Sequence, residues 1–105
     1  MTDSEFLILT DGIFARIENA IDDAGLDADF LTTGNVLELE FDNGAKIVVN
    51  RHSSNHELWI AAKSGGYHFA WNDGQWLAAR DGAEFFATLS QAVRDASGQD
   101  FELGE

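Results

Sequence analysis

Hydrophobic positions recur along this chain with a helical period at both ends and a period of two between them. The first apolar stripe, with three- and four-residue steps, consists of Phe6, Leu9, Ile13, Ile17, Ile21 and Ala24. This spacing predicts an amphipathic helix over residues 3–24. Thr2 and Glu5 fit a capping box at its start, and Gly25 fits a stop after its end.

From residue 29 to about residue 80 the apolar residues alternate with polar ones, which is typical of β-strands. In the predicted strand 36–41, Leu37, Leu39 and Phe41 face one side of a sheet, and Glu38 and Glu40 face the other. Asn43-Gly44 is a strong hairpin signal and joins this strand to the next. That next strand is 45–50, and a polar turn follows it at 52–55. Turn and strand patterns then predict three more strands, 57–62, 67–71 and 75–79.

The helical period returns after residue 80. Asp81-Gly82-Ala83-Glu84 fits a second capping box, and the helix after it has Gly98 as its stop and the apolar positions Phe85, Leu89, Val93 and Ala96. Short connections favour antiparallel pairing, and two terminal helices must bury their stripes against one sheet face. We therefore predict an α+β fold over a single domain, 1–105. It is a two-layer α/β sandwich with both helices on one face of an antiparallel sheet of five to six strands, and the other face is open.

Charge is the unusual feature of the composition. The chain has 19 acidic and 6 basic residues and a net charge of −13. Phosphate binding needs lysine and arginine, so this balance argues against nucleic acid and against anionic membranes as partners. The chain has no cysteine, which excludes disulfides and thiolate metal sites. No apolar run reaches the length of a membrane span, and we expect a cytoplasmic protein.

The negative charge is concentrated in the first 42 residues, which hold eleven acidic residues and one base. On a helix, Asp11, Glu18 and Asp22 fall within about 40° of one another, opposite the apolar stripe, with Asp23 at their edge. Glu18 and Asp22 form a like-charged i,i+4 pair that costs about 0.2–0.5 kcal/mol. Asp22 and Asp23 also occupy the last turn, where the helix dipole favours cations. Asp27 and Asp29 extend the negative surface into the following strand.

This acidic surface has two interpretations, a solvated helix face or a binding site. Carboxylate oxygens suit hard or borderline cations such as Mg²⁺, Ca²⁺, Mn²⁺ and Fe²⁺/Fe³⁺, which a surface row would bind weakly. A basic protein patch is an equally good partner, because the long-range field would steer it in. Asp3 and Glu5 are explained by capping and the dipole.

A second candidate surface is the open sheet face. If Leu58 and Ile60 face the helices, Trp59 points outward, where an exposed tryptophan is a typical interface anchor. Asn50 and Arg51 end the preceding strand and are expected to share that face. We interpret Trp71 and Trp76 as packing residues. Metal binding by the histidines is a weak signal; they are His52, His56 and His68. No feature indicates an enzyme.

Over nearly its whole length the chain resembles bacterial frataxin, the CyaY family. The segments that carry the resemblance are Asp3-Ser4-Glu5-Phe6, Ile21-Asp22-Asp23, Asn43 to Arg51, Leu58-Trp59-Ile60-Ala61 and Gly65-Gly66-Tyr67-His68-Phe69. The resemblance implies an α/β sandwich that binds iron (Fe²⁺/Fe³⁺) weakly and modulates iron–sulfur cluster assembly. It also implies a cysteine desulfurase as partner of the acidic surface and an iron–sulfur scaffold protein as partner of the sheet.

Carried over position by position, the family's acidic ridge corresponds to Asp3, Asp11, Glu18, Asp22, Asp23, Asp27 and Asp29. Its sheet surface corresponds to Asn50, Arg51 and Trp59. The chain departs from the family pattern at Leu7, Asn19 and Glu57. We therefore hypothesise a non-enzymatic, iron-binding regulator, a monomer or an iron-driven oligomer. The alternatives are an acidic adaptor for basic proteins with incidental iron binding, and a ferroxidase that stores iron as an oligomer.

Overall fold

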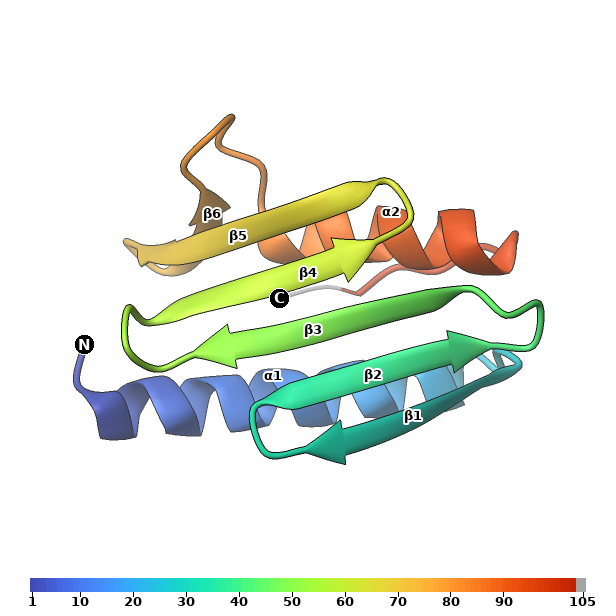
Figure 1. Ribbon diagram of the computed structural model, residues 1–105, viewed down its shortest axis with the longest axis horizontal. Helices are drawn as coiled ribbons and strands as arrows, with labels where there is room; N and C mark the ends of the chain where they lie inside the picture. The colour runs from blue at the N-terminus through green and yellow to red at the C-terminus, as the bar shows by residue number, and fades with distance from the viewer. Residues whose placement is uncertain (104–105) are drawn as a thin grey trace.

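The computed structural model describes residues 1–103 and places two helices on one face of a six-stranded sheet (Figure 1). The helices are α1 (Asp3–Asp23) and α2 (Phe85–Ser97). The strands are β1 (Ala28–Thr33), β2 (Val36–Phe41), β3 (Lys46–His52), β4 (Glu57–Ala62), β5 (Gly65–Asn72) and β6 (Gln75–Ala78). Each strand pairs antiparallel with the next along the chain, so the predicted α+β two-layer sandwich is confirmed.

Helix α1 begins and ends where its capping residues direct. The Thr2 hydroxyl accepts a hydrogen bond from the Glu5 amide at 3.1 Å, and the Glu5 carboxylate accepts one from the Thr2 amide at 2.8 Å. The bond from the Thr2 amide, followed by the contact with the Thr2 side chain, lowers the pKa of Glu5, because both stabilise the ionised carboxylate. At the other end, Gly25 adopts φ +66°, a left-handed conformation that glycine tolerates well.

The start of α2 differs from the prediction. Glu84, not Asp81, is the N-cap, and its carboxylate accepts hydrogen bonds from the amides of Phe86 and Ala87. Gly82 has φ +75°, which no helical residue adopts, and Glu84 forms a β-bridge with Leu77 of β6. Residues 82–84 therefore return along the sheet edge before the helix begins, and the expected capping box at Asp81 is wrong.

The core lies between the sheet and the helices, as the alternation predicts. Leu37, Leu39 and Phe41 of β2 are buried there. The segment after α2 also contributes, because Phe101 and Leu103 are buried and the Leu103 amide donates to the buried Ser90 hydroxyl at 2.9 Å. In Figure 1 this segment passes behind the sheet, between the two helices. Within residues 1–103, the sheet's second face carries no helix.

Candidate functional site: an acidic surface and an open sheet face

The acidic surface follows one side of α1 and continues onto β1. Asp11, Asp22 and Asp23 are exposed on the helix, and Glu18 is half-buried where the helix meets β1. Asp27 precedes β1, and Asp29 lies within it. Asp11, Glu18, Asp22 and Asp23 therefore share one side of α1, Asp29 pairs with Glu40 and points to the open face of the sheet beside them, and Asp3 lies at the opposite end of α1.

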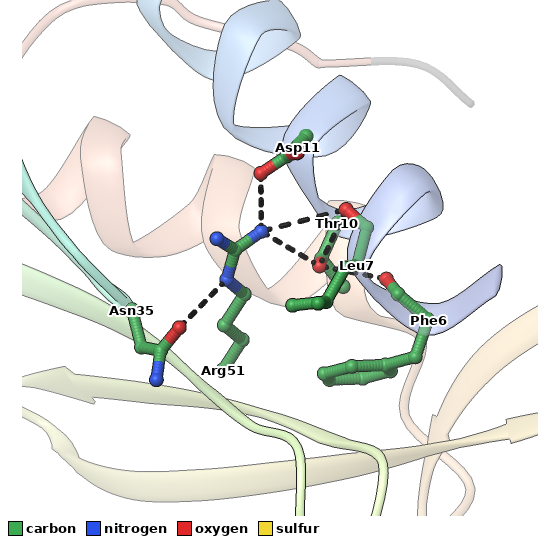
Figure 2. A network of polar contacts seen from close by, with 6 residues as sticks. All are labelled: Phe6, Leu7, Thr10, Asp11, Asn35 and Arg51. Atoms are coloured by element: carbon green, nitrogen blue, oxygen red, sulfur yellow. Dashed lines mark hydrogen bonds and ion pairs between the residues drawn. The ribbon is translucent and has the colours of Figure 1, made fainter. Parts of the chain in front are cut away.

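Asp11 is neutralised by an arginine from the sheet (Figure 2). The Arg51 guanidinium donates through Nη1 to Asp11 Oδ1 and to Thr10 Oγ1, and through Nε to Asn35 Oδ1. It also lies over the Phe14 ring, 5.3 Å from the centroid. Since only 11% of the Arg51 side chain is exposed, this arginine is a structural link between β3 and α1.

The expectation that Arg51 shares the open face with Asn50 and Trp59 is wrong. Strand β3 continues to His52, so neighbouring residues along it point to opposite faces. Arg51 pairs in register with the buried Leu58 and points to the helix side. Asn50 pairs with Trp59 and points to the open side, where Trp59 is 37% exposed, as predicted.

Two further acidic residues also have partners. Glu18 Oε2 accepts a hydrogen bond from the Thr32 hydroxyl of β1 at 2.6 Å, which ties the helix to the edge strand. Asp3 Oδ1 lies 2.6 Å from His56 Nε2, and the His56 ring stacks on Phe6 at 5.1 Å between centroids. Asp3 therefore secures the start of α1 to the β3–β4 turn, and it lies apart from the rest of the acidic surface.

The remaining carboxylates form the uncompensated part of this surface. Within residues 1–103, the side chains of Asp22, Asp23, Asp27 and Asp29 form no hydrogen bond or ion pair with another side chain. No basic residue occupies the last turn of α1. We call these four aspartates the unpaired acidic cluster.

The β1–β2 hairpin adds negative charge beside this cluster. Asp29 lies directly opposite Glu40 in the strand register, an arrangement that destabilises a sheet because the charges repel. A shallow hollow at this end of the hairpin is lined by four carboxylates, those of Asp27, Asp29, Glu40 and Asp42. The neighbouring cation, Lys46, forms its ion pair at 3.2 Å with Glu38, whose carboxylate raises the pKa of Lys46. Sequence reasoning had not assigned Glu40 and Asp42 to this surface.

The acidic surface does not form a chelating site. Among residues 1–103, no group of three or more acidic or histidine side chains is close enough to hold one metal ion. The oxygen donors suit hard cations, but each ion would meet only one or two carboxylates and would keep most of its water. The arrangement therefore fits weak cation association, without the selectivity that a supported ligand set provides.

The open sheet face carries an aromatic cluster around Trp59. The Trp59 ring lies between the imidazoles of His52 and His68, at 4.8 and 4.9 Å between centroids. Its Nε1 donates to Glu57 Oε1 at 3.2 Å, and the second oxygen of Glu57 lies 3.5 Å from His68 Nδ1. Asn50 Nδ2 lies 3.3 Å from His52 Nε2. These side chains form an aromatic and polar surface that includes the Glu57 carboxylate.

Comparison with known proteins places the chain in a family. Residues 1–99 match the family model of the frataxin-like domain. The chain belongs to the frataxin family. It is 64% identical over 103 residues to the iron-sulfur cluster assembly protein CyaY of Chromobacterium violaceum, covering 98% of both chains. It is 52% identical to the CyaY protein of Neisseria meningitidis serogroup B, over 100% of this chain and 98% of that protein.

Solved frataxin structures confirm the fold. The frataxin of Psychromonas ingrahamii superposes with a TM-score of 0.91 at 37% identity and covers both chains completely. The trimeric frataxin of Saccharomyces cerevisiae, in its ferrous complex, gives a TM-score of 0.71 at 23% identity over 90% of this chain and 87% of that one. Neither helix within residues 1–103 is long and apolar enough to cross a membrane.

Proposed function

We propose that this protein acts in iron–sulfur cluster assembly by docking on a cysteine desulfurase through its acidic surface and modulating the desulfurase activity. Its relatives at 64% and 52% identity carry the name iron-sulfur cluster assembly protein, which supports the pathway. The main support for docking through this surface is the unpaired acidic cluster of Asp22, Asp23, Asp27 and Asp29.

The repulsion around this cluster lowers the stability of the folded chain and favours association with a cationic partner. Glu18 and Asp22 repel each other, and Asp22 and Asp23 oppose the helix dipole. Asp11, by contrast, already has a cation from within the protein, Arg51. An incoming basic surface would relieve the remaining repulsion, and the field of a chain with a net charge of −13 would accelerate the encounter.

Iron is the second ligand of the proposed site, bound weakly as Fe²⁺ or Fe³⁺. The central ligands are Glu18, Asp22 and Asp23, with Asp11, Asp27 and Asp29 as auxiliary ligands; the charge of Asp11 is already balanced by Arg51. Asp3 is bound to His56 and far from this cluster, so we assign it no direct share in the affinity. Because iron and the desulfurase would use the same carboxylates, each should weaken binding of the other by the same factor.

The open face is the proposed contact for the iron–sulfur scaffold protein. Asn50 and Trp59 lie on it side by side in register, and Trp59 offers a large apolar surface with a hydrogen-bonding edge. Arg51 lies on the opposite face and contributes to this contact only by holding β3 against α1.

A titration of the cysteine desulfurase with this protein at several Fe²⁺ concentrations tests the proposal. We expect Asp22→Asn to weaken desulfurase binding and Fe²⁺ to raise the apparent dissociation constant of the unmodified chain. Asp95→Asn is the matched control, because it removes an exposed carboxylate from the last turn of α2, away from the cluster. Equal effects of the two substitutions would refute a localised docking site.

A second candidate function is an acidic adaptor whose effect on the desulfurase needs no iron. The lack of a three-ligand metal site among residues 1–103 favours it. Desulfurase assays with chelator-treated protein distinguish the two. Unchanged modulation after chelation would support the adaptor, and loss of modulation with recovery on adding Fe²⁺ would support the iron-dependent regulator.

A further inference from the structure

An apolar groove borders α1 on the side away from β1. Its floor is formed by the buried Trp76 and Phe86, and its walls by Ile8 and Leu9 of α1 and by Trp71 of β5. The Trp71 and Trp76 rings meet edge to face at 5.2 Å, so one wall is held rigidly. Its volume of about 370 Å³ is near the lower end of the range for small-molecule pockets, a size that suits a few side chains.

The groove coincides with an unusual concentration of exposed apolar side chains. Ile8 is 72% exposed and Trp71 is 40% exposed, and Leu9 beside them is exposed as well. Elsewhere on soluble proteins, exposed apolar residues are mostly scattered, whereas a contiguous patch with polar surroundings marks an interaction site. The exposure of Ile8 and Leu9 to solvent does not contribute to the stability of the fold.

Gly12 lies in the groove and has no structural reason to be glycine. It occupies the interior of α1, where glycine destabilises a helix relative to alanine. Its φ is not positive, and a Cβ added to it would meet no atom within 4 Å. Neither backbone conformation nor close packing therefore requires this residue. Its effect is to leave the groove open along the helix between Ile8 and Arg16.

The net charge of the chain indicates which kind of protein would bind in this groove. A second copy would bring another net charge of −13, so self-association is opposed by repulsion. A basic protein is attracted instead. Asp22 lies about 40° around the α1 axis from Ile8 and about 21 Å further along it, a distance that a protein interface of ordinary size, about 800 Å² on each partner, spans. A partner seated on the acidic flank would therefore reach across Ile8 into the groove.

We infer that the groove receives an apolar side chain of the same basic partner that docks on the acidic surface. This inference rests on the proposed function and deepens it. The carboxylates attract and orient the partner through a salt-sensitive contact, and the groove supplies a salt-insensitive anchor. Arg16 closes one end of the groove, with its guanidinium over the Phe86 ring at 4.7 Å, and so limits how far an inserted side chain can extend.

Two substitutions at one position test this inference with the cysteine desulfurase as the probe. Gly12→Leu fills the groove, while Gly12→Ala adds only a methyl group and serves as its matched control. Both should raise the thermal midpoint, because both improve the helix. We expect Gly12→Ala to bind within about twofold of the unmodified chain, and Gly12→Leu to bind about tenfold more weakly at low and at high salt, as for loss of one interface anchor. Ile8→Ser should weaken binding in the same salt-independent way.

Each result bears on the inference. If Gly12→Leu and Ile8→Ser bind as tightly as the unmodified chain while Asp22→Asn binds more weakly, the groove inference is overturned and the proposed function stands. If the unmodified chain does not bind the desulfurase even at low salt, both are overturned. A concentration-dependent dimer that Gly12→Leu abolishes would identify a second copy as the occupant and overturn the inference.

Discussion

Arg51 provides the sharpest test of how this fold is held together. We expect Arg51→Met to destabilise the protein substantially, because it removes the guanidinium that joins α1 to β3 and keeps most of the aliphatic stem. The substitution breaks the contacts to Asp11, Thr10 and Asn35 and the stacking over Phe14.

The size of the effect follows from the exposure of the partners. Asp11 is 67% exposed, so its ion pair with Arg51 is screened by solvent and contributes about 0.5 kcal/mol. The hydrogen bonds to Thr10 and Asn35 have a charged donor that is mostly buried, and together they contribute about 1.5 kcal/mol. The expected loss is about 2 kcal/mol, which for a domain of this size lowers the thermal midpoint by about 9 °C.

Thermal and urea unfolding followed by circular dichroism measure this loss. Lys46→Met is the matched control, since it removes another paired cation from β3, but one that points to the open face and lies in solvent. It should leave the midpoint nearly unchanged. If Arg51→Met costs no more than Lys46→Met, Arg51 is not a structural link, and its original assignment to the partner-binding surface would regain support.

Three further substitutions test individual contacts. Asp22→Lys should raise stability by about 0.5–1 kcal/mol at low salt by ending the repulsion with Glu18 and matching the helix dipole, a gain that thermal melts should lose in concentrated salt, and it should weaken desulfurase binding. Gly12→Ala should stabilise the fold by about 1 kcal/mol in urea unfolding; a loss would reveal a packing role for this glycine. Glu5→Gln should destabilise the protein at neutral pH, and because the folded pKa of Glu5 is lowered, this difference should shrink as melts are recorded at pH values falling through that pKa. A difference that persists in acid would mean that the Thr2 bonds do not require the carboxylate.

Local patterns predicted most of the fold because each signal had a nearby cause. The Thr2 and Glu5 capping box formed as expected, and the alternation along β2 buried Leu37 and Leu39 on the helix side. The start of α2 could not be read in this way. Its cap depends on Gly82 turning into a left-handed conformation and on a bridge from Glu84 to β6, which are tertiary features.

The sequence predicted which residues form the acidic surface but not which of them are paired within the fold. The sequence shows a row of carboxylates on α1, but only the register of β3 shows that Arg51 crosses to neutralise Asp11. Strand β3 extends two residues beyond the predicted end at Asn50. Arg51 is therefore part of the strand and points to the face opposite that of Asn50. The contact of the tilted His52 ring with Trp59 and the stacking of His68 on Trp59 likewise join three strands and leave no local sequence signal.

The structure therefore separates the acidic residues that have a side-chain partner within the fold from those that have none among residues 1–103. Asp3, Asp11 and Glu18 have side-chain partners within the fold, whereas the carboxylates of the unpaired acidic cluster have none among residues 1–103. The distinction matters for mutagenesis, because substitution of Asp11 or Glu18 alters both stability and charge, while substitution within the cluster alters charge with little structural cost.

Nuclear magnetic resonance titration of the isotope-labelled protein with the cysteine desulfurase tests the central claim most directly. The account predicts that backbone amides of residues 18–29 shift or broaden at low salt and recover in concentrated salt, while those around Trp59 keep their positions. A response centred on Trp59, or no response along residues 18–29, would contradict it.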